Sequence, residues 1–321
     1  MFSYLIAMLR RSWRMFVTVS KVMLPVMIIV QIAEEFGLVG QAGRLIAPAM
    51  SLLHLPPEAG IIWATTVLTG IYGGIASLSG LAGSVEMTAA QLSALCAMML
   101  FAHGLPVEQA IVRRAGASFW ATAALRIVTA LAYGAAVSWA CHLTGTLDQP
   151  VSFEWLRGSA AVPDGGANIY LGWIQATAFS LLLTFAIIVI LVAALDALDR
   201  LGITRRITAA MMPLLRASGL NAQVAPVTTV GVLLGLTYGG ALIIEAAAKQ
   251  DFSARTRFLA LCWLSLSHSL IEDTLLLMAL GADVWIILVG RVMVTLAIVA
   301  ALARLTGRGG WRAEPAGAGP S

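Results

Sequence analysis

Two histidines lie in similar surroundings about 165 residues apart, and each is followed five residues later by a carboxylate. His103 precedes Glu108, while His268 precedes Asp273, whose neighbour Glu272 is also acidic. An imidazole and a carboxylate can exchange a proton near neutral pH, and together they suit a divalent metal such as iron, zinc or manganese. These five residues are the first candidates for a binding site. The sequence leaves open that the histidines are instead helix caps that support folding.

Further residues repeat at the same offset. A Tyr-Gly-Gly triplet precedes each histidine, and one arginine lies in the apolar segment that follows it. The matched residues are Tyr72, Gly73 and Gly74 with Tyr238, Gly239 and Gly240, Arg126 with Arg291, and Gly37 and Pro48 with Gly202 and Pro213. Duplicated halves with interrupted apolar segments are typical of transporter-like folds, in which the binding site lies between the halves.

The triplets and the arginines each have two interpretations. Paired glycines let the backbone approach a ligand closely, but they equally allow close helix packing in a membrane. An unpaired arginine inside an apolar span costs roughly 2.5–3.5 kcal/mol, so each should find a carboxylate, a helix C-terminus or a bound anion. A structural ion pair is favoured for both arginines. The expected partners are Glu34, Glu35, Asp196, Asp199 and Glu245.

Composition sets the class of protein. The 321 residues are 60% hydrophobic and only 11% charged, whereas a soluble domain is about one-quarter charged. An all-α polytopic membrane protein follows, with apolar stretches of about 20 residues as its spans. The net charge of +4 comes from short loops, where positive-inside bias explains it, and it does not indicate nucleic-acid binding. Neither a cofactor-binding motif nor a catalytic motif is present, so we expect no cofactor and no enzymatic activity.

The chain divides into five parts. These are an amphipathic N-terminal helix (1–16), a first repeat (17–142), a polar linker (143–168), a second repeat (169–305) and a disordered Gly/Pro-rich tail (306–321). Gly104 and Pro106 predict a helix break directly after His103. If each repeat crosses the membrane three times with a re-entrant segment before its histidine, most Lys and Arg residues lie on the side of the N-terminus. The positive-inside rule then favours inverted repeats and a cytoplasmic N-terminus, in a bacterial inner membrane.

The sequence around the first histidine resembles a known family. Phe-Ala-His-Gly-Leu-Pro-Val-Glu-Gln-Ala-Ile-Val-Arg-Arg-Ala-Gly (101–116) is similar to the motif of the nucleoside recognition (Gate) membrane proteins, and Ser-His-Ser-Leu-Ile-Glu-Asp-Thr (267–274) is similar to a second copy. The resemblance extends over about residues 15–305.

It implies a duplicated helical domain related to the membrane part of ferrous iron transporter B. It also implies kinship with spore maturation proteins A and B and, more distantly, with concentrative nucleoside transporters. It points to His103, Glu108, His268 and Asp273. The chain departs from the iron transporter because it has no GTP-binding motif, and Ile271 stands where the first copy has Pro106.

Three functions remain open on these grounds. The first is a transporter that binds a nucleoside-like small polar solute between the two repeats. The second is a divalent metal (ferrous iron) permease, with His103 and His268 as ligands. The third is a non-transporting membrane scaffold that assembles with a partner protein. The expected partners are the lipid bilayer and a small polar solute or divalent cation, with a homo-oligomer or a membrane partner left open and no nucleic acid.

Overall fold

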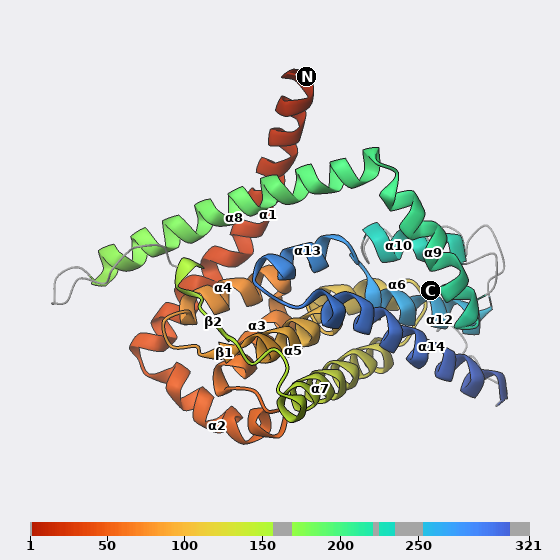
Figure 1. Ribbon diagram of the computed structural model, residues 1–321, viewed down its shortest axis with the longest axis horizontal. Helices are drawn as coiled ribbons and strands as arrows, with labels where there is room; N and C mark the ends of the chain where they lie inside the picture. The colour runs from red at the N-terminus through yellow and green to blue at the C-terminus, as the bar shows by residue number, and fades with distance from the viewer. Residues whose placement is uncertain (1, 157–168, 221–224, 235–252, 309–321) are drawn as a thin grey trace, which may run out of the picture. The chain divides into compact units, whose positions relative to one another are not determined.

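The computed structural model describes residues 2–156, 169–220, 225–234 and 253–308 (Figure 1). These residues are almost entirely helical, which confirms the predicted all-α fold. The helices of the N-terminal half are α1 (Phe2–Glu35), α2 (Leu38–Leu52), α3 (Pro57–Thr69), α4 (Ile71–Leu81), α5 (Ala89–Phe101), α6 (Leu105–Arg114) and α7 (Phe119–Thr144). Those of the C-terminal half are α8 (Ile169–Arg200), α9 (Ile203–Ala217), α10 (Ala225–Leu234), α12 (Ala254–Ser267), α13 (Glu272–Ala279), the π-helix Trp285–Gly290 and α14 (Arg291–Arg308).

Several of the described helices are long and apolar enough to cross a membrane, which makes the chain a multi-pass membrane protein. The five such segments are Ile6–Ala33, Ala89–Arg114, Phe119–Thr144, Leu171–Arg200 and Trp285–Gly307. A sixth arises if Arg44–Leu52 and Pro57–Thr69, which meet at 93°, count as one bent span.

The structure has no boundary at residue 16, where an amphipathic helix was expected to end. Helix α1 runs without interruption from Phe2 to Glu35, with Pro25 inside it. No glycine or proline precedes Pro25 in this stretch, so nothing in the sequence ends the helix earlier. On this helix Phe16 lies edge-on to Phe185 of α8, with ring centroids 5.2 Å apart. The amphipathic segment and the first span are therefore one continuous element.

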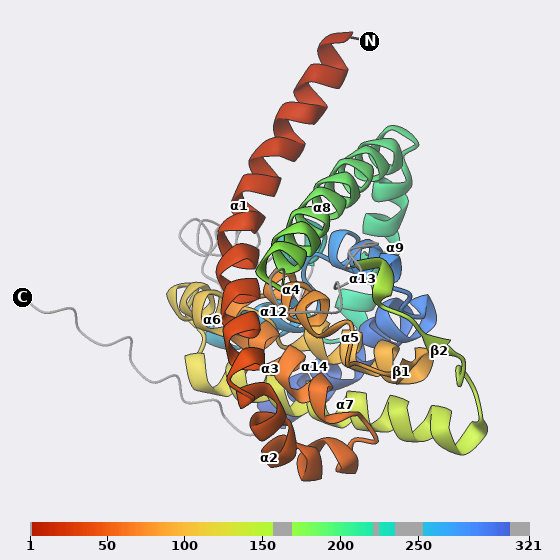
Figure 2. The ribbon, with the colours of Figure 1, turned by 90° about the vertical axis from the view of Figure 1, so that its left-hand side faces the viewer.

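One compact unit comprises Met1–Leu105, Ile127–Leu201 and Ile271–Leu288. In it α1 packs against α4 and α8, and α3 packs against α2, α4 and α5 (Figures 1 and 2). Every residue of α5 except Gln91 is buried, so α5 forms the core of this unit.

The sequence fixes the start of α5. Thr88 and Gln91 form a capping box, in which each side chain bonds the other residue's backbone N–H, and this arrangement satisfies donors that a helix start leaves open. Directly before it, strand β1 (Met87–Thr88) pairs with β2 (Pro150–Val151) from the linker. This short strand pair was not predicted.

The second compact unit comprises Pro106–Arg126, Gly202–Leu270 and Val289–Ser321. Helix α12 packs against α10 and α14, while α9 packs against α10 and α14. Within this unit the buried Trp263 donates its indole N–H to Ser218 Oγ at 2.6 Å. Each unit combines segments from both halves of the chain, so the units do not coincide with the predicted repeats.

Matched positions of the two halves do share backbone geometry. Gly37 and Gly202 precede α2 and α9 with φ angles of 66° and 69°, in the left-handed region that glycine adopts without strain. Both helices have 15 residues and contain a proline at the same place, Pro48 and Pro213. The repeat is thus visible locally, and beyond such positions it stays a prediction.

The described residues cover only part of the expected linker and tail. Helix α7 extends to Thr144, and a 3-10 turn covers Glu154–Leu156. Residues 157–168 and 309–321 lie outside the described residues, as do Tyr238, Gly239, Gly240 and Glu245.

Candidate functional site

The predicted break after the first histidine is present. Helix α5 ends at Phe101 and α6 begins at Leu105, with Gly104 between them at a φ of 54°. His103 is buried, and its Nδ1 lies 2.8 Å from the carbonyl oxygen of Met99. Because a carbonyl can only accept, Nδ1 must carry the proton. The tautomer of His103 is therefore set by the last turn of its own helix.

The second histidine repeats this arrangement. Helix α12 ends at Ser267, and Nδ1 of His268 lies 2.8 Å from the carbonyl oxygen of Leu264. Ser269 follows with a φ of 48°, which is rare for a residue other than glycine. The chain thus bends in the same way after both histidines, although a serine replaces the glycine in the second copy.

Glu108 of α6 connects the two halves within the second compact unit. Its Oε1 lies 3.2 Å from Nε2 of His268, 160 residues away in sequence, and its Oε2 accepts a hydrogen bond from Arg126 Nη1. The side chain of Arg126 is fully buried and that of His268 nearly so, while Glu108 is 18% exposed. A carboxylate that retains some contact with water therefore binds two buried groups.

The Glu108–His268 contact holds one proton. Since Nδ1 of His268 already donates to Leu264, the contact through Nε2 needs a proton that belongs either to the imidazole or to the carboxyl group. Arg126 stabilises the ionised carboxylate through its positive charge. The arrangement can accept, hold or release a proton at a defined pair of atoms.

Arg291 is held differently. It begins α14 directly after the π-helix, and its Nε and Nη2 donate to the carbonyl oxygens of Leu266 and His268 at 2.9 and 3.2 Å. These carbonyls belong to the C-terminal end of α12, where a cation is electrostatically favourable. Nearby, the hydroxyls of Ser267 and Thr295 are 2.8 Å apart.

The partner of Arg126 differs from the acids expected from sequence. Glu108 lies only 18 residues before it, on the next helix. Of the expected acids, Asp196 pairs instead with Arg11 at 3.1 Å, and Glu35 accepts a hydrogen bond from Gln31. The sequence signal for the true partner was available, because Glu108 had already been singled out beside His103.

The remaining predicted residues that the structure describes lie in the first compact unit. Tyr72, Gly73 and Gly74 belong to α4, while Glu272 and Asp273 form the first turn of α13. A Cβ atom on Gly74 would lie 1.9 Å from Thr66 Oγ1 and 2.8 Å from Met99 Cε. At Gly74 the glycine therefore permits close packing of α4 on α3 and α5.

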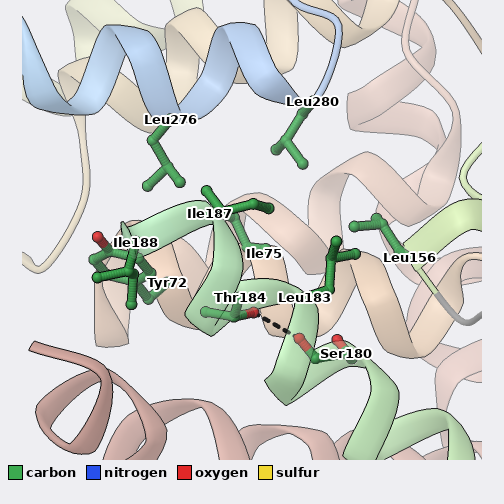
Figure 3. Close-up of a pocket in the computed structure, with 10 residues that line it drawn as sticks. All are labelled: Tyr72, Ile75, Leu156, Ser180, Leu183, Thr184, Ile187, Ile188, Leu276 and Leu280. Atoms are coloured by element: carbon green, nitrogen blue, oxygen red, sulfur yellow. Dashed lines mark hydrogen bonds between the residues drawn. The ribbon is translucent and has the colours of Figure 1, made fainter. Parts of the chain in front are cut away.

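Tyr72 also lines a pocket within the first unit, between α4, α8 and α13 (Figure 3). Leu276 of α13 and Leu280, directly after that helix, point toward the α8 side chains, and the remaining wall is mostly Leu and Ile. The hydroxyl of Thr184 donates to the Ser180 carbonyl at 2.8 Å, so its own helix already satisfies it. The sequence did not indicate this pocket, because its α8 residues read as an ordinary apolar span.

The comparisons with known proteins agree with the sequence motif. Residues 16–118 match the family described as nucleoside recognition (Gate). The chain is also 25% identical over 286 residues to the uncharacterized membrane protein YvoD of Bacillus subtilis (strain 168), covering 89% of each protein. No solved structure matches the chain. The resemblance of the second half to the family stays a prediction, and the chain is a multi-pass membrane protein whose residues 16–118 are similar to the Gate family.

Proposed function

We propose that this protein is a membrane carrier that binds a small polar solute of the nucleoside class at Glu108, Arg126 and His268, and that it moves the solute chemically unchanged. The observation that carries the proposal is the contact of Glu108 with both Arg126 and His268 in a chain that is 60% hydrophobic. Ionisable groups are costly in such segments and mark solute or ion pathways. The description of the matching family supports the solute class.

The donors and acceptors of this cluster suit a nucleoside. A carboxylate can accept hydrogen bonds from the hydroxyls of a ribose, as acidic residues do in dinucleotide-binding proteins. The guanidinium group of Arg126 offers several donors in a fixed plane. Glu108 remains partly exposed, so a solute can reach it.

A divalent metal fits Glu108 less well. The guanidinium group of Arg126 bonds the same carboxylate, and its positive charge opposes a second cation there. A metal permease that uses Glu108 would first have to separate it from Arg126. For this reason the polar solute is the better-supported cargo.

The proton between Glu108 and His268 provides a means of coupling. A solute hydroxyl that takes the place of His268 at Oε1 removes the partner with which the carboxylate shares its proton. Solute binding should then change the number of protons bound, which calorimetry in buffers of different ionisation enthalpy measures. A proton count of zero in every buffer would contradict this coupling.

The proposed orientation places the N-terminus in the cytoplasm of a bacterium, with the carrier in the inner membrane. Arg10, Arg11 and Arg14 on the first helix support it through the positive-inside rule. Labelling of single cysteines introduced at residues 10 and 146 with a membrane-impermeant reagent tests the orientation. Labelling of residue 10 from outside intact cells would contradict it.

The deciding experiment measures thermal unfolding of the purified protein against nucleosides, bases, nucleotides and divalent metals. A ligand that binds the folded state at about 100 times its dissociation constant adds roughly 2.7 kcal/mol of stability. We expect a shift with a nucleoside that is lost in Glu108→Gln and His268→Gln. The matched control, Glu86→Gln, changes an exposed acid and should keep the shift.

Each other outcome contradicts the proposal in a defined way. A shift with iron or manganese alone would favour the metal permease. The absence of any shift, together with co-purification of a stable membrane partner, would favour the scaffold.

A further inference from the structure

The two histidines outside the repeated sequence motifs contact each other. The chain has four histidines, and the rings of His54 and His142 have centroids 3.9 Å apart with planes inclined by 42°. His54 lies in the turn between α2 and α3, and His142 lies in the last turn of α7. Both belong to the first compact unit. No motif in the sequence relates them, so folding alone brings them together.

The backbone at His54 is held in an unusual conformation. Its φ angle is 54°, a value that costs free energy in residues other than glycine and that persists only where the surroundings enforce it. Its carbonyl oxygen accepts hydrogen bonds from Gln91 Nε2 at 3.1 Å and Ser138 Oγ at 3.0 Å. Trp139 Nε1 donates to the nearby carbonyl of Leu52 at 2.8 Å. Side chains of α5 and α7 thus fix the turn that carries His54.

The ring nitrogens of this pair are available. Among the described residues, the hydrogen bonds at His54 are made by its backbone and none is made by either imidazole. His142 is exposed and His54 is half-buried, so both rings can be reached from outside. The C-terminal end of α7 also lies at His142, and the partial negative charge of its terminal carbonyls favours a bound cation.

We propose that His54 and His142 bind a divalent transition-metal ion of the kind that imidazole prefers, such as Zn²⁺. Two neutral imidazoles would supply the protein ligands, fewer than the three or four of most zinc sites, and water molecules would complete the coordination. The ion would link the bend between α2 and α3 to the end of α7. This site is separate from the solute cluster and shares no residue with it, so the two proposals can fail independently.

The test is Zn²⁺ binding by the full-length protein, measured by equilibrium dialysis with elemental analysis and by thermal unfolding. The variants are His54→Asn and His142→Gln, since asparagine tolerates a left-handed backbone better than most residues. We expect one bound Zn²⁺ per chain and a Zn²⁺-dependent rise in Tm in the wild type, with both lost in either variant.

Unfolding in the presence of EDTA separates a folding defect from a loss of metal binding, because the variants should then melt close to the wild type. The variant His103→Gln/His268→Gln should still bind the ion. Absence of Zn²⁺ binding by the wild type would overturn the proposal. So would equal binding by His54→Asn and His142→Gln, or loss of binding only in His103→Gln/His268→Gln.

Discussion

Oε1 of Glu108 lies 3.2 Å from Nε2 of His268, although the two residues are separated by 160 positions in the sequence. The other carboxylate oxygen of Glu108 bonds the buried Arg126. Glu108 therefore connects His268, at a helix break in the second half, with Arg126 in the first half. Both contacts depend on whether the Glu108 carboxyl group is ionised.

The Glu108–Arg126 pair should behave as a coupled unit in stability measurements. Arg126→Met removes one partner of a buried ion pair and should cost about 3–5 kcal/mol. Glu108→Gln keeps an acceptor for Arg126 but removes the negative charge, so it should also destabilise. The double variant should lose less stability than the two single variants lose in sum, because neither charge of the pair remains. Thermal unfolding in detergent measures this, and strict additivity would show that the pair is not coupled.

A matched control is available for that cycle. Glu86 is exposed and precedes strand β1, so Glu86→Gln should change stability by no more than about 0.5 kcal/mol.

The left-handed residues after the two histidines should respond oppositely to substitution. Ser269 has a φ of 48°, a conformation that costs roughly 1–2 kcal/mol in residues with a Cβ atom. Ser269→Gly should therefore be neutral or stabilising. Gly104 has a φ of 54°, so Gly104→Ala should destabilise by about 1 kcal/mol. Equal Tm changes of the same sign would contradict the backbone geometry at these breaks.

Gly74 should tolerate no added side chain. Because a Cβ atom there would meet Thr66 Oγ1 and Met99 Cε, Gly74→Ala should cost about 1–3 kcal/mol through overpacking. Thr66→Ala removes the nearest obstructing atom, so Gly74→Ala on that background should cost less. If the cost were the same on both backgrounds, close packing would not explain the glycine.

The N-terminus offers a test of pH dependence outside the spans. The hydrogen bond from Tyr4 to Asp196 raises the pKa of the Tyr4 hydroxyl above its usual value of 10.0. A raised pKa means that the folded state retains this proton, so the stabilisation is complete below about pH 10 and is lost as pH rises through the folded pKa. Tyr4→Phe keeps a ring beneath Arg200, whose Cζ lies 4.0 Å from the ring centroid.

The comparison to make is Tm between pH 8 and pH 11 for wild type and Tyr4→Phe. The Tm of the wild type should exceed that of Tyr4→Phe at pH 8, and this difference should shrink above pH 10. A constant difference over the whole range would contradict the role of this hydrogen bond.

The sequence predicted the class of fold and the helix breaks because these depend on local signals. Apolar stretches identified spans, and Gly104 with Pro106 identified the break after His103, which the structure confirms. It also singled out Glu108, Arg126 and His268 before their contacts were known. It did not predict that Glu108 binds both others, because this depends on how helices distant in sequence pack.

Other features had no local signal at all. The contact of His54 with His142 joins a turn to the end of a distant helix. The pairing of Met87–Thr88 with Pro150–Val151 is likewise a long-range contact between segments with no strand pattern of their own. The change in polarity near residue 16 likewise has no counterpart in the backbone, because α1 continues through it from Phe2 to Glu35.

The two matched arginines, Arg126 and Arg291, donate hydrogen bonds to different kinds of acceptor. Two hydrogen bonds of Arg291 end on the carbonyl oxygens of Leu266 and His268, which neither gain nor lose protons at physiological pH. One hydrogen bond of Arg126 ends on the carboxylate of Glu108, which protonation can neutralise. Protonation of Glu108 would therefore weaken this contact of Arg126, whereas it would not alter the two carbonyl contacts of Arg291. The matched arginines therefore differ in the chemistry of these contacts, although they stand at positions that correspond in sequence.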